Sequence, residues 1–108
     1  GYKMAIVEKV SDITISNVAD YMRVADPNEN EIGTYLNIAK DYISNYTGIP
    51  KTSNDKGAET LDSYSDFVIV VYILCQDMYD NRTLYVDKAN LNKVVQTILD
   101  MHCRVQLW

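Results

Sequence analysis

The sequence predicts an all-α protein, a small bundle of about four helices around a central apolar helix at about residues 63–81. Nine apolar residues follow one another at 67–75 in a chain that is otherwise polar and acidic. No Gly or Pro interrupts residues 61–86, and the apolar pattern continues past the run to Met78 and Tyr79. Because an uninterrupted stretch of this length is longer than a typical strand, we interpret it as a helix rather than as a buried strand.

The central helix is expected to supply most of the core. We expect the rest of the chain to cover its apolar run on all sides. Cys75, inside the run, is interpreted as a small buried hydrophobe. The expected buried face consists of Phe67, Val71, Leu74 and Met78, with Val68 and Cys75 beside it.

Composition limits the classes of protein that fit. With 108 residues, 47% of them hydrophobic and 23% charged, the chain is expected to form one domain that spans 1–108. Fifteen acidic residues against ten basic ones argue against a nucleic-acid binder, because such proteins neutralise phosphates with Lys and Arg. The apolar run is too short to span a bilayer, and no signal-peptide pattern opens the chain. We therefore expect a protein of the cytosol, or of an assembly built there, without membrane contact.

The amino-terminal part is expected to contain one short helix. Residues 1–13 have a weak apolar pattern and form either a short helix or a frayed arm, with 1–12 as the flexible part. Thr14 is expected to cap a helix that ends around residues 23–25. The apolar residues that follow this cap at helical spacing are Ile15, Val18, Ala19 and Met22.

The second helix is expected at about residues 28–47. Asp26 is a capping residue, Pro27 suits the first helical turn and Glu29 completes a capping box. Gly48 is expected to end the helix in the left-handed conformation, and Pro50 bars its continuation. The expected apolar stripe of this helix consists of Ile32, Tyr35, Leu36, Ala39, Ile43 and Tyr46.

Two connections and a last helix complete the predicted bundle. Residues 51–59 form a long polar loop before the central helix. The second connection, 83–90, is expected to pack Leu84, Tyr85 and Val86 against the bundle. A helix from about residue 90 and an apolar tail at 102–108 follow. The periodic residues of this helix are Leu91, Val94, Val95, Ile98, Leu99 and Met101.

No pattern in the sequence indicates an enzyme, a metal site or a cofactor site. His102 is the single histidine, and no motif places a Ser or Asp beside it. Cys75 and Cys103 are too few for a disulfide framework or a zinc site. Four acidic residues near the first turn between helices either bind a divalent cation or cap and solvate the turn, and capping is the simpler explanation. These residues are Asp20, Asp26, Glu29 and Glu31.

The chain contains nine tyrosines, a high count. Tyrosine suits half-buried positions and protein interfaces, because an apolar ring carries a polar tip. Two interpretations stay open: tyrosines at the edge of the core with hydroxyls that reach water, and tyrosines on a contact surface. The residues concerned are Tyr35, Tyr42, Tyr46, Tyr72 and Tyr79.

Two helix endings carry a resemblance to a known family. The second helix ends in Tyr-Thr-Gly at 46–48, and the central helix ends in Tyr-Asp-Asn-Arg at 79–82. Together with the short helix from 13 to 24 and the acidic turn before 39–48, their order resembles the head-tail connector proteins of long-tailed phages and prophages. The similarity covers roughly residues 13–99.

The resemblance implies a structural adaptor rather than a catalyst. Such a protein forms a ring of about a dozen copies below the portal protein, a closed homo-oligomer. It joins the head to tail or head-completion proteins and lines a channel through which DNA passes without sequence-specific binding. An acidic chain is consistent with this role because it repels phosphates. The implied location is the head–tail interface of the virion, with the host bacterial cytoplasm during assembly.

Ring formation requires that one patch meets a different patch on the next copy. The candidate subunit-interface residues are Tyr35, Tyr42, Tyr72, Arg104, Val105, Leu107 and Trp108. The candidates for a loop that faces the channel or the next ring are Lys51, Thr52, Ser53, Asn54, Asp55 and Lys56. Arg82 matches the helix-end Arg of the family, and we interpret it as a helix-dipole partner or a salt bridge to Asp77 or Asp80.

A second class of function stays open from the sequence. A small helical regulatory or peptide-binding module would capture a partner helix in an apolar groove. Rings, or binding to portal protein, would favour the connector. A chain that stays monomeric or dimeric would favour the module.

Overall fold

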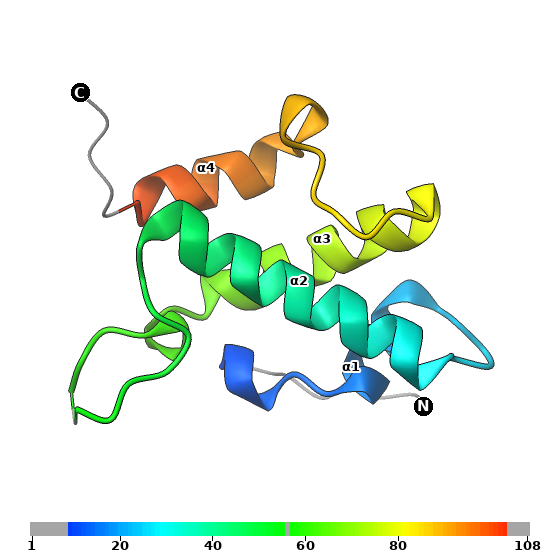
Figure 1. The fold of residues 1–108 in the computed structure, drawn as a ribbon, viewed down its shortest axis with the longest axis horizontal. Helices are drawn as coiled ribbons and strands as arrows, with labels where there is room; N and C mark the ends of the chain where they lie inside the picture. The colour runs from blue at the N-terminus through cyan, green and yellow to red at the C-terminus, as the bar shows by residue number, and fades with distance from the viewer. Residues whose placement is uncertain (1–8, 56, 104–108) are drawn as a thin grey trace, which may run out of the picture.

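The computed structural model describes residues 9–55 and 57–103, and it confirms the all-α class. That part of the chain contains four α-helices, three short 3-10 turns and no strand (Figure 1). The helices are α1 (Ile15–Met22), α2 (Glu29–Thr47), α3 (Asp66–Asn81) and α4 (Lys93–Met101), and the turns are η1 (Val10–Asp12), η2 (Leu61–Ser63) and η3 (Lys88–Asn90).

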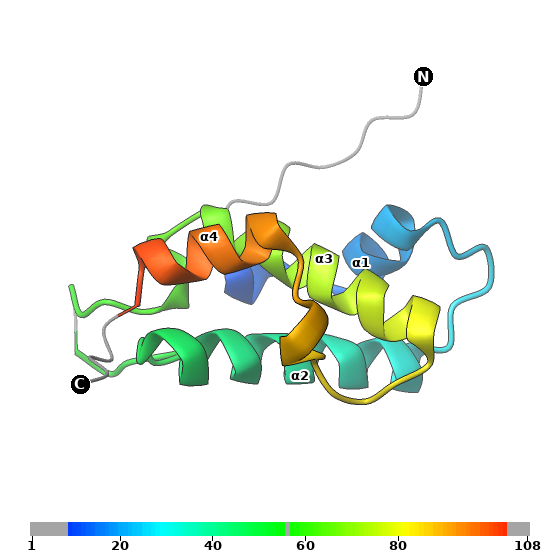
Figure 2. The ribbon, with the colours of Figure 1, turned by 90° about the horizontal axis from the view of Figure 1, so that it is seen from above.

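The helices pack in two layers. α2, the longest of them, lies along one side, and α1, α3 and α4 lie along the other (Figure 2). α2 contacts all three helices of the opposite layer, and α3 also contacts both α1 and α4. α3 is therefore central to the bundle, as the sequence predicts.

The predicted buried face of α3 is confirmed. Each side chain of that face is at most 5% exposed. Burial raises the pKa of the Cys75 thiol to about 12, which makes it the inert, hydrophobic cysteine that was expected. The prediction of cover on all sides is wrong at Ile69, whose side chain is 54% exposed. Position 69 lies about half a turn away from Phe67 and Val71, so it faces away from the core.

α3 begins at Asp66, three residues after its predicted start at 63. Residues Leu61–Ser63 form η2 instead. The side chain of Thr60 accepts a hydrogen bond from the backbone N–H of Asp62, and Ser63 accepts one from the N–H of Thr60. Such local side-chain bonds satisfy the backbone without an α-helix, which explains the later start.

The capping residues predicted at the start of α1 and at the end of α2 are confirmed, and the cap predicted at the start of α2 is wrong. Thr14 caps α1 through a reciprocal capping box with Asn17. Gly48 ends α2 in the left-handed region, at φ 77°, as predicted. Asp26 is not the cap of α2. Asn28 is, because its side chain accepts from the backbone N–H of Glu31, and the helix starts one residue later than predicted.

The described part of the amino-terminal segment is attached to the bundle. Val10 and Ile13 are 2% and 4% exposed. The backbone N–H and the hydroxyl of Ser11 donate to the two carboxylate oxygens of Asp62, at 2.9 and 2.7 Å. The expected frayed arm is therefore wrong for residues 9–12, and residues 1–8 lie outside the described chain.

The connection between α3 and α4 packs less closely than predicted. Leu84 and Tyr85 are each 63% exposed, and only Val86 of the three expected residues packs against the core. α4 starts at Lys93, after a cap by Asn92, rather than near residue 90. On α4, Val95 and Leu99 are buried, and the exposed members of the predicted stripe are Val94 and Met101.

Candidate functional site

One predicted interface residue lies in the core. Tyr35 is only 3% exposed, so its assignment to an outer contact surface is wrong. Its stripe on α2 packs against α3, and its ring meets Tyr79 edge-on, with the centroids 6.4 Å apart. Its hydroxyl donates to Oε1 of Glu31 at 2.8 Å. Burial, and then this hydrogen bond, raise the pKa of Tyr35.

The other two interface tyrosines are half-buried. Tyr72 of α3 stacks on Tyr21 of α1, with the centroids 4.9 Å apart and the planes 9° from parallel. Tyr42 of α2 lies at a tilt to Tyr46, one turn further along the helix. Both side chains pack against the core and remain partly exposed, so both remain candidates for contact with another chain.

Arg82 forms its ion pair with a carboxylate of α2 rather than with a carboxylate of its own helix, α3. Its Nη1 donates to Oε1 of Glu31 at 2.9 Å, and its guanidinium lies 4.5 Å from the centroid of the Tyr79 ring. The expected partners Asp77 and Asp80 are wrong. Arg82 is the left-handed cap of α3, at φ 54°, and this conformation follows the last turn of the helix. The acidic start of α2 and the end of α3 are thereby joined through one carboxylate.

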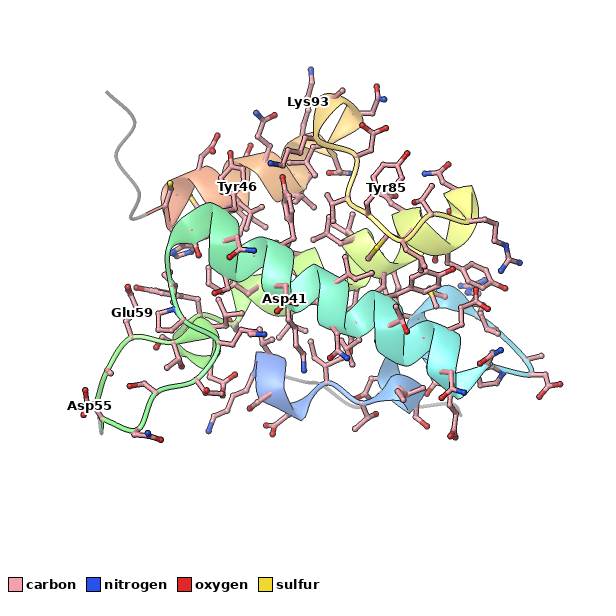
Figure 3. All side chains as sticks on the ribbon, viewed as in Figure 1. Asp41, Tyr46, Asp55, Glu59, Tyr85 and Lys93 are labelled. Carbon is pink, nitrogen blue, oxygen red and sulfur yellow. The ribbon has the colours of Figure 1, made fainter. Side chains whose placement is uncertain are left out.

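The described residues of the polar loop are exposed, as residues that face a channel or a neighbouring ring would be. Residues 51–55 are all exposed, and Asp55 lies at the far end of the loop (Figure 3). Lys51 forms an ion pair with Asp41 of α2, which ties the start of the loop to the bundle. Among the remaining candidates, Lys56 and the tail residues Arg104, Val105, Leu107 and Trp108 lie outside the described chain.

His102 has a carboxylate partner that sequence reasoning missed. Its Nε2 lies 3.2 Å from Oδ2 of Asp66, and its ring packs against Tyr64 and Phe67. Asp66 is 36 positions away, so no sequence motif could have found it. The imidazole packs among aromatic rings at the junction of α3 and α4. This geometry fastens the end of α4 to the start of α3.

A second contact fixes α4 from the other side. The hydroxyl of Tyr46 donates to Oδ1 of Asp100, and Figure 3 shows Tyr46 on α2 directed towards α4. The hydrogen bond with Asp100, and then burial, raise the pKa of Tyr46 to about 12. The thiol of Cys103 donates to the backbone carbonyl of Tyr46 at 3.5 Å. α4 is therefore held by polar contacts to both α2 and α3.

Exposed apolar side chains occur on both α3 and α4. Ile69 of α3 is 54% exposed, and Val94 and Met101 of α4 are 55% and 61% exposed. Val94 and Met101 are seven residues apart and share one side of α4. On a helical projection, that side lies about equally far from Asp100, which faces α2, and from His102, which faces α3, and it points away from the buried Leu99. We call Val94 and Met101 the outer apolar face of α4.

Two hollows flank the exposed connection between α3 and α4. The first, of about 140 Å³, lies between the last turns of α3 and residues 83–91. The second is shallow, of about 270 Å³, and lies between α2 and residues 84–86. A third hollow, of about 330 Å³, lies by η1, η2 and Lys51. The walls of the second and third hollows come from segments that are distant along the chain, so no local sequence pattern indicates them.

The remaining observations bear on the chemistry that the chain can support. Across residues 9–55 and 57–103, no three His, Cys, Asp or Glu side chains are grouped as a metal ion requires. None of the described helices has the length and hydropathy of a membrane span. No protein-family model, curated protein or solved structure matches this chain.

Proposed function

We propose that this chain is a structural head-tail connector of a tailed phage or prophage, which assembles as a ring below the portal protein. It joins head and tail, contacts tail or head-completion proteins, and lines the channel through which DNA passes. Its place of action is the head–tail interface of the virion, after assembly in the host bacterial cytoplasm.

One contact supports this function most directly. The segments that carry the resemblance include the acidic turn that leads into residues 39–48, which contains the first turn of α2, and the Tyr-Asp-Asn-Arg ending of α3. Glu31 and Arg82 come from these two segments and form an ion pair, with Tyr79 stacked beneath the guanidinium. Residues that resemble the family at separate places in the sequence thus act as one structural unit, which favours a shared fold over chance similarity.

The surface is consistent with assembly. A head-to-tail ring uses two different patches on each copy. The outer apolar face of α4 is one such patch, and the ridge of Leu84 and Tyr85 is another. The net charge of −5 repels DNA phosphates and so favours passage without adhesion. The exposed loop at 51–55 has no core side chain and is free to face the channel or the next ring.

The decisive experiment mixes the full chain with the portal protein encoded near it. We expect co-sedimentation with about one copy per portal subunit, as matched rotational symmetry requires, and ring density below the portal by negative-stain electron microscopy. The variant Met101→Lys should lose the ring and keep the helical circular-dichroism spectrum. Gln96→Lys, also exposed on α4, is the matched control and should assemble. If the unmodified chain, at micromolar excess, never sediments with the portal, the connector function is wrong.

A second candidate function is the small helical regulatory or peptide-binding module. The hollow between α3 and residues 83–91 favours it, because buried Leu74 and Met78 line a recess with polar edges. A chain that stays monomeric with the portal present, and that binds a helical peptide at this recess, would support the module over the connector.

A further inference from the structure

The hollow between α3 and the 83–91 segment has an apolar floor and an acidic rim. Leu74 and Met78, which are 2% and 1% exposed, form the floor. Asp77 and Asp87 are exposed and lie on the rim, together with the ring of Tyr85. Its volume of about 140 Å³ is several times the roughly 30 Å³ share of a liquid water molecule, so a side chain fits.

The two carboxylates of the rim lack a counter-charge within the described chain. Among the described residues, none forms a hydrogen bond or an ion pair with the carboxylate of Asp77, and burial and then the nearby Asp80 raise its pKa. Asp87 accepts hydrogen bonds from the backbone N–H of Ala89 and from Nδ2 of Asn90, and the bond with Asn90 lowers its pKa. Asp87 is therefore held as an anion, and Asp77 gains from any cation that enters the hollow.

The rim continues into an apolar ridge. Leu84 and Tyr85 are each 63% exposed. On the far side of this ridge lies the shallow hollow, lined in part by Ile38 and Tyr42 of α2. Figure 3 shows Tyr85 on the connection between α3 and α4, far from the loop that carries Asp55. The ridge places apolar surface directly beside the acidic recess.

We propose that the hollow is a docking site for a Lys or Arg side chain of a protein partner, with an apolar residue of the same partner against Leu84. The aliphatic stem of the basic side chain lies on Leu74 and Met78. Its charged end pairs with Asp77 and Asp87, and the ring of Tyr85 adds a cation–π contact. The negative rim and the apolar floor together favour a long cationic side chain over an apolar side chain. The inference rests on the hollow itself and holds with or without the connector function.

The test is an NMR titration of the full-length, ¹⁵N-labelled chain with N-acetyl-lysine N-methylamide. N-acetyl-norleucine N-methylamide is the matched probe, because it keeps the aliphatic stem and lacks the charge. We expect shift changes that saturate in the millimolar range and are centred on residues 77, 85 and 86. The norleucine probe should bind at least about threefold more weakly, which is the size of one surface ion pair.

Two variants separate the hollow from general charge attraction. Asp77→Asn should weaken binding of the lysine probe by about threefold to fivefold, because it removes a rim carboxylate. Asp80→Asn removes the same charge from the same helix but from a residue outside the hollow, so binding should stay nearly unchanged. Both positions are exposed, and both variants should fold.

Three outcomes would overturn the proposal. Equal binding of the two probes would indicate a purely apolar site. Equal loss in the two variants would indicate general charge attraction. Larger shifts of the same residues with Mg²⁺ than with the lysine probe would indicate an ion site. Because portal protein is not part of this titration, its result is separate from that of the connector experiment.

Discussion

The apolar run of α3 and the apolar residues of the connection that follows it have similar composition and very different surroundings. In α3, six core positions are at most 2% exposed, at 67, 70, 71, 74, 75 and 78. In the connection, Leu84 and Tyr85 are each 63% exposed. A helix repeats every 3.6 residues, so α3 can direct most of its apolar side chains to one side. The connection has no such repeat, and only Val86 reaches the core.

The comparison shows that the surroundings of an apolar side chain, and not its residue type alone, decide whether it stabilises the fold. Buried apolar side chains of α3 stabilise the fold, since their removal leaves a cavity. Exposed apolar side chains of the connection contribute little to folding and are available to a partner. The same reasoning applies to polar residues. A polar side chain that forms a hydrogen bond in the folded protein contributes more to stability than a neighbouring polar side chain that forms none.

The largest expected effect comes from the same substitution in the two regions. Leu74→Ala should lower the free energy of unfolding by about 2–5 kcal/mol, because it leaves a cavity under α2 and α3. Leu84→Ala should change it by no more than about 0.5 kcal/mol, because the side chain is already in solvent. Urea unfolding followed by circular dichroism measures both. Similar losses in the two variants would mean that the connection packs as closely as α3.

Much of the fold could be predicted from the sequence, because its signals are local. Thr14 caps α1 and Gly48 ends α2 as predicted, since each acts through bonds or backbone conformation within a few residues. The buried face of α3 follows from helical periodicity alone. Errors occur at the starts of α2, α3 and α4, at the amino-terminal segment, at Ile69 and in the connection. At Ile69 and in the connection, burial of the side chain would have required cover by a neighbouring helix.

The contacts of the candidate site could not be predicted in the same way. Glu31 and Arg82 are 51 positions apart, and His102 and Asp66 are 36 apart. Such pairs form only after α2, α3 and α4 have packed, so no local pattern encodes them. Tyr35 shows a different error. Its helical position correctly predicts the apolar stripe of α2, whereas the interface role that was expected from the resemblance is wrong, because its side chain is buried.

A second pair of substitutions extends the comparison to two polar residues of one turn. Asn28→Ala should lower the free energy of unfolding by about 1 kcal/mol, because its side chain caps the N–H of Glu31. Asp26→Ala should change it by less than about 0.5 kcal/mol, because no bond of Asp26 appears in the described chain. Thermal and urea unfolding measure the difference. A larger loss at Asp26 would restore it as the cap and displace Asn28.

The smallest expected effect concerns Tyr46, a tyrosine with a partner, in contrast to the exposed Tyr85. The bond with Asp100 raises the pKa of Tyr46 from 10.0 to about 12, so the neutral phenol is favoured in the folded state. Its contribution is fully present below pH 10 and is lost as the pH rises through 12. At neutral pH, Tyr46→Phe should lower the free energy of unfolding by about 0.5 kcal/mol, the low end for an exposed hydrogen bond.

The pH dependence of that difference separates the hydrogen bond from packing of the ring. Phenylalanine keeps the ring, so the gap in stability between the unmodified chain and Tyr46→Phe should close between pH 10 and 12. Tyr85→Phe, at a position 63% exposed, is the control and should leave neutral-pH stability unchanged. A gap that stays constant through pH 12 would mean that Asp100 does not hold the phenol of Tyr46.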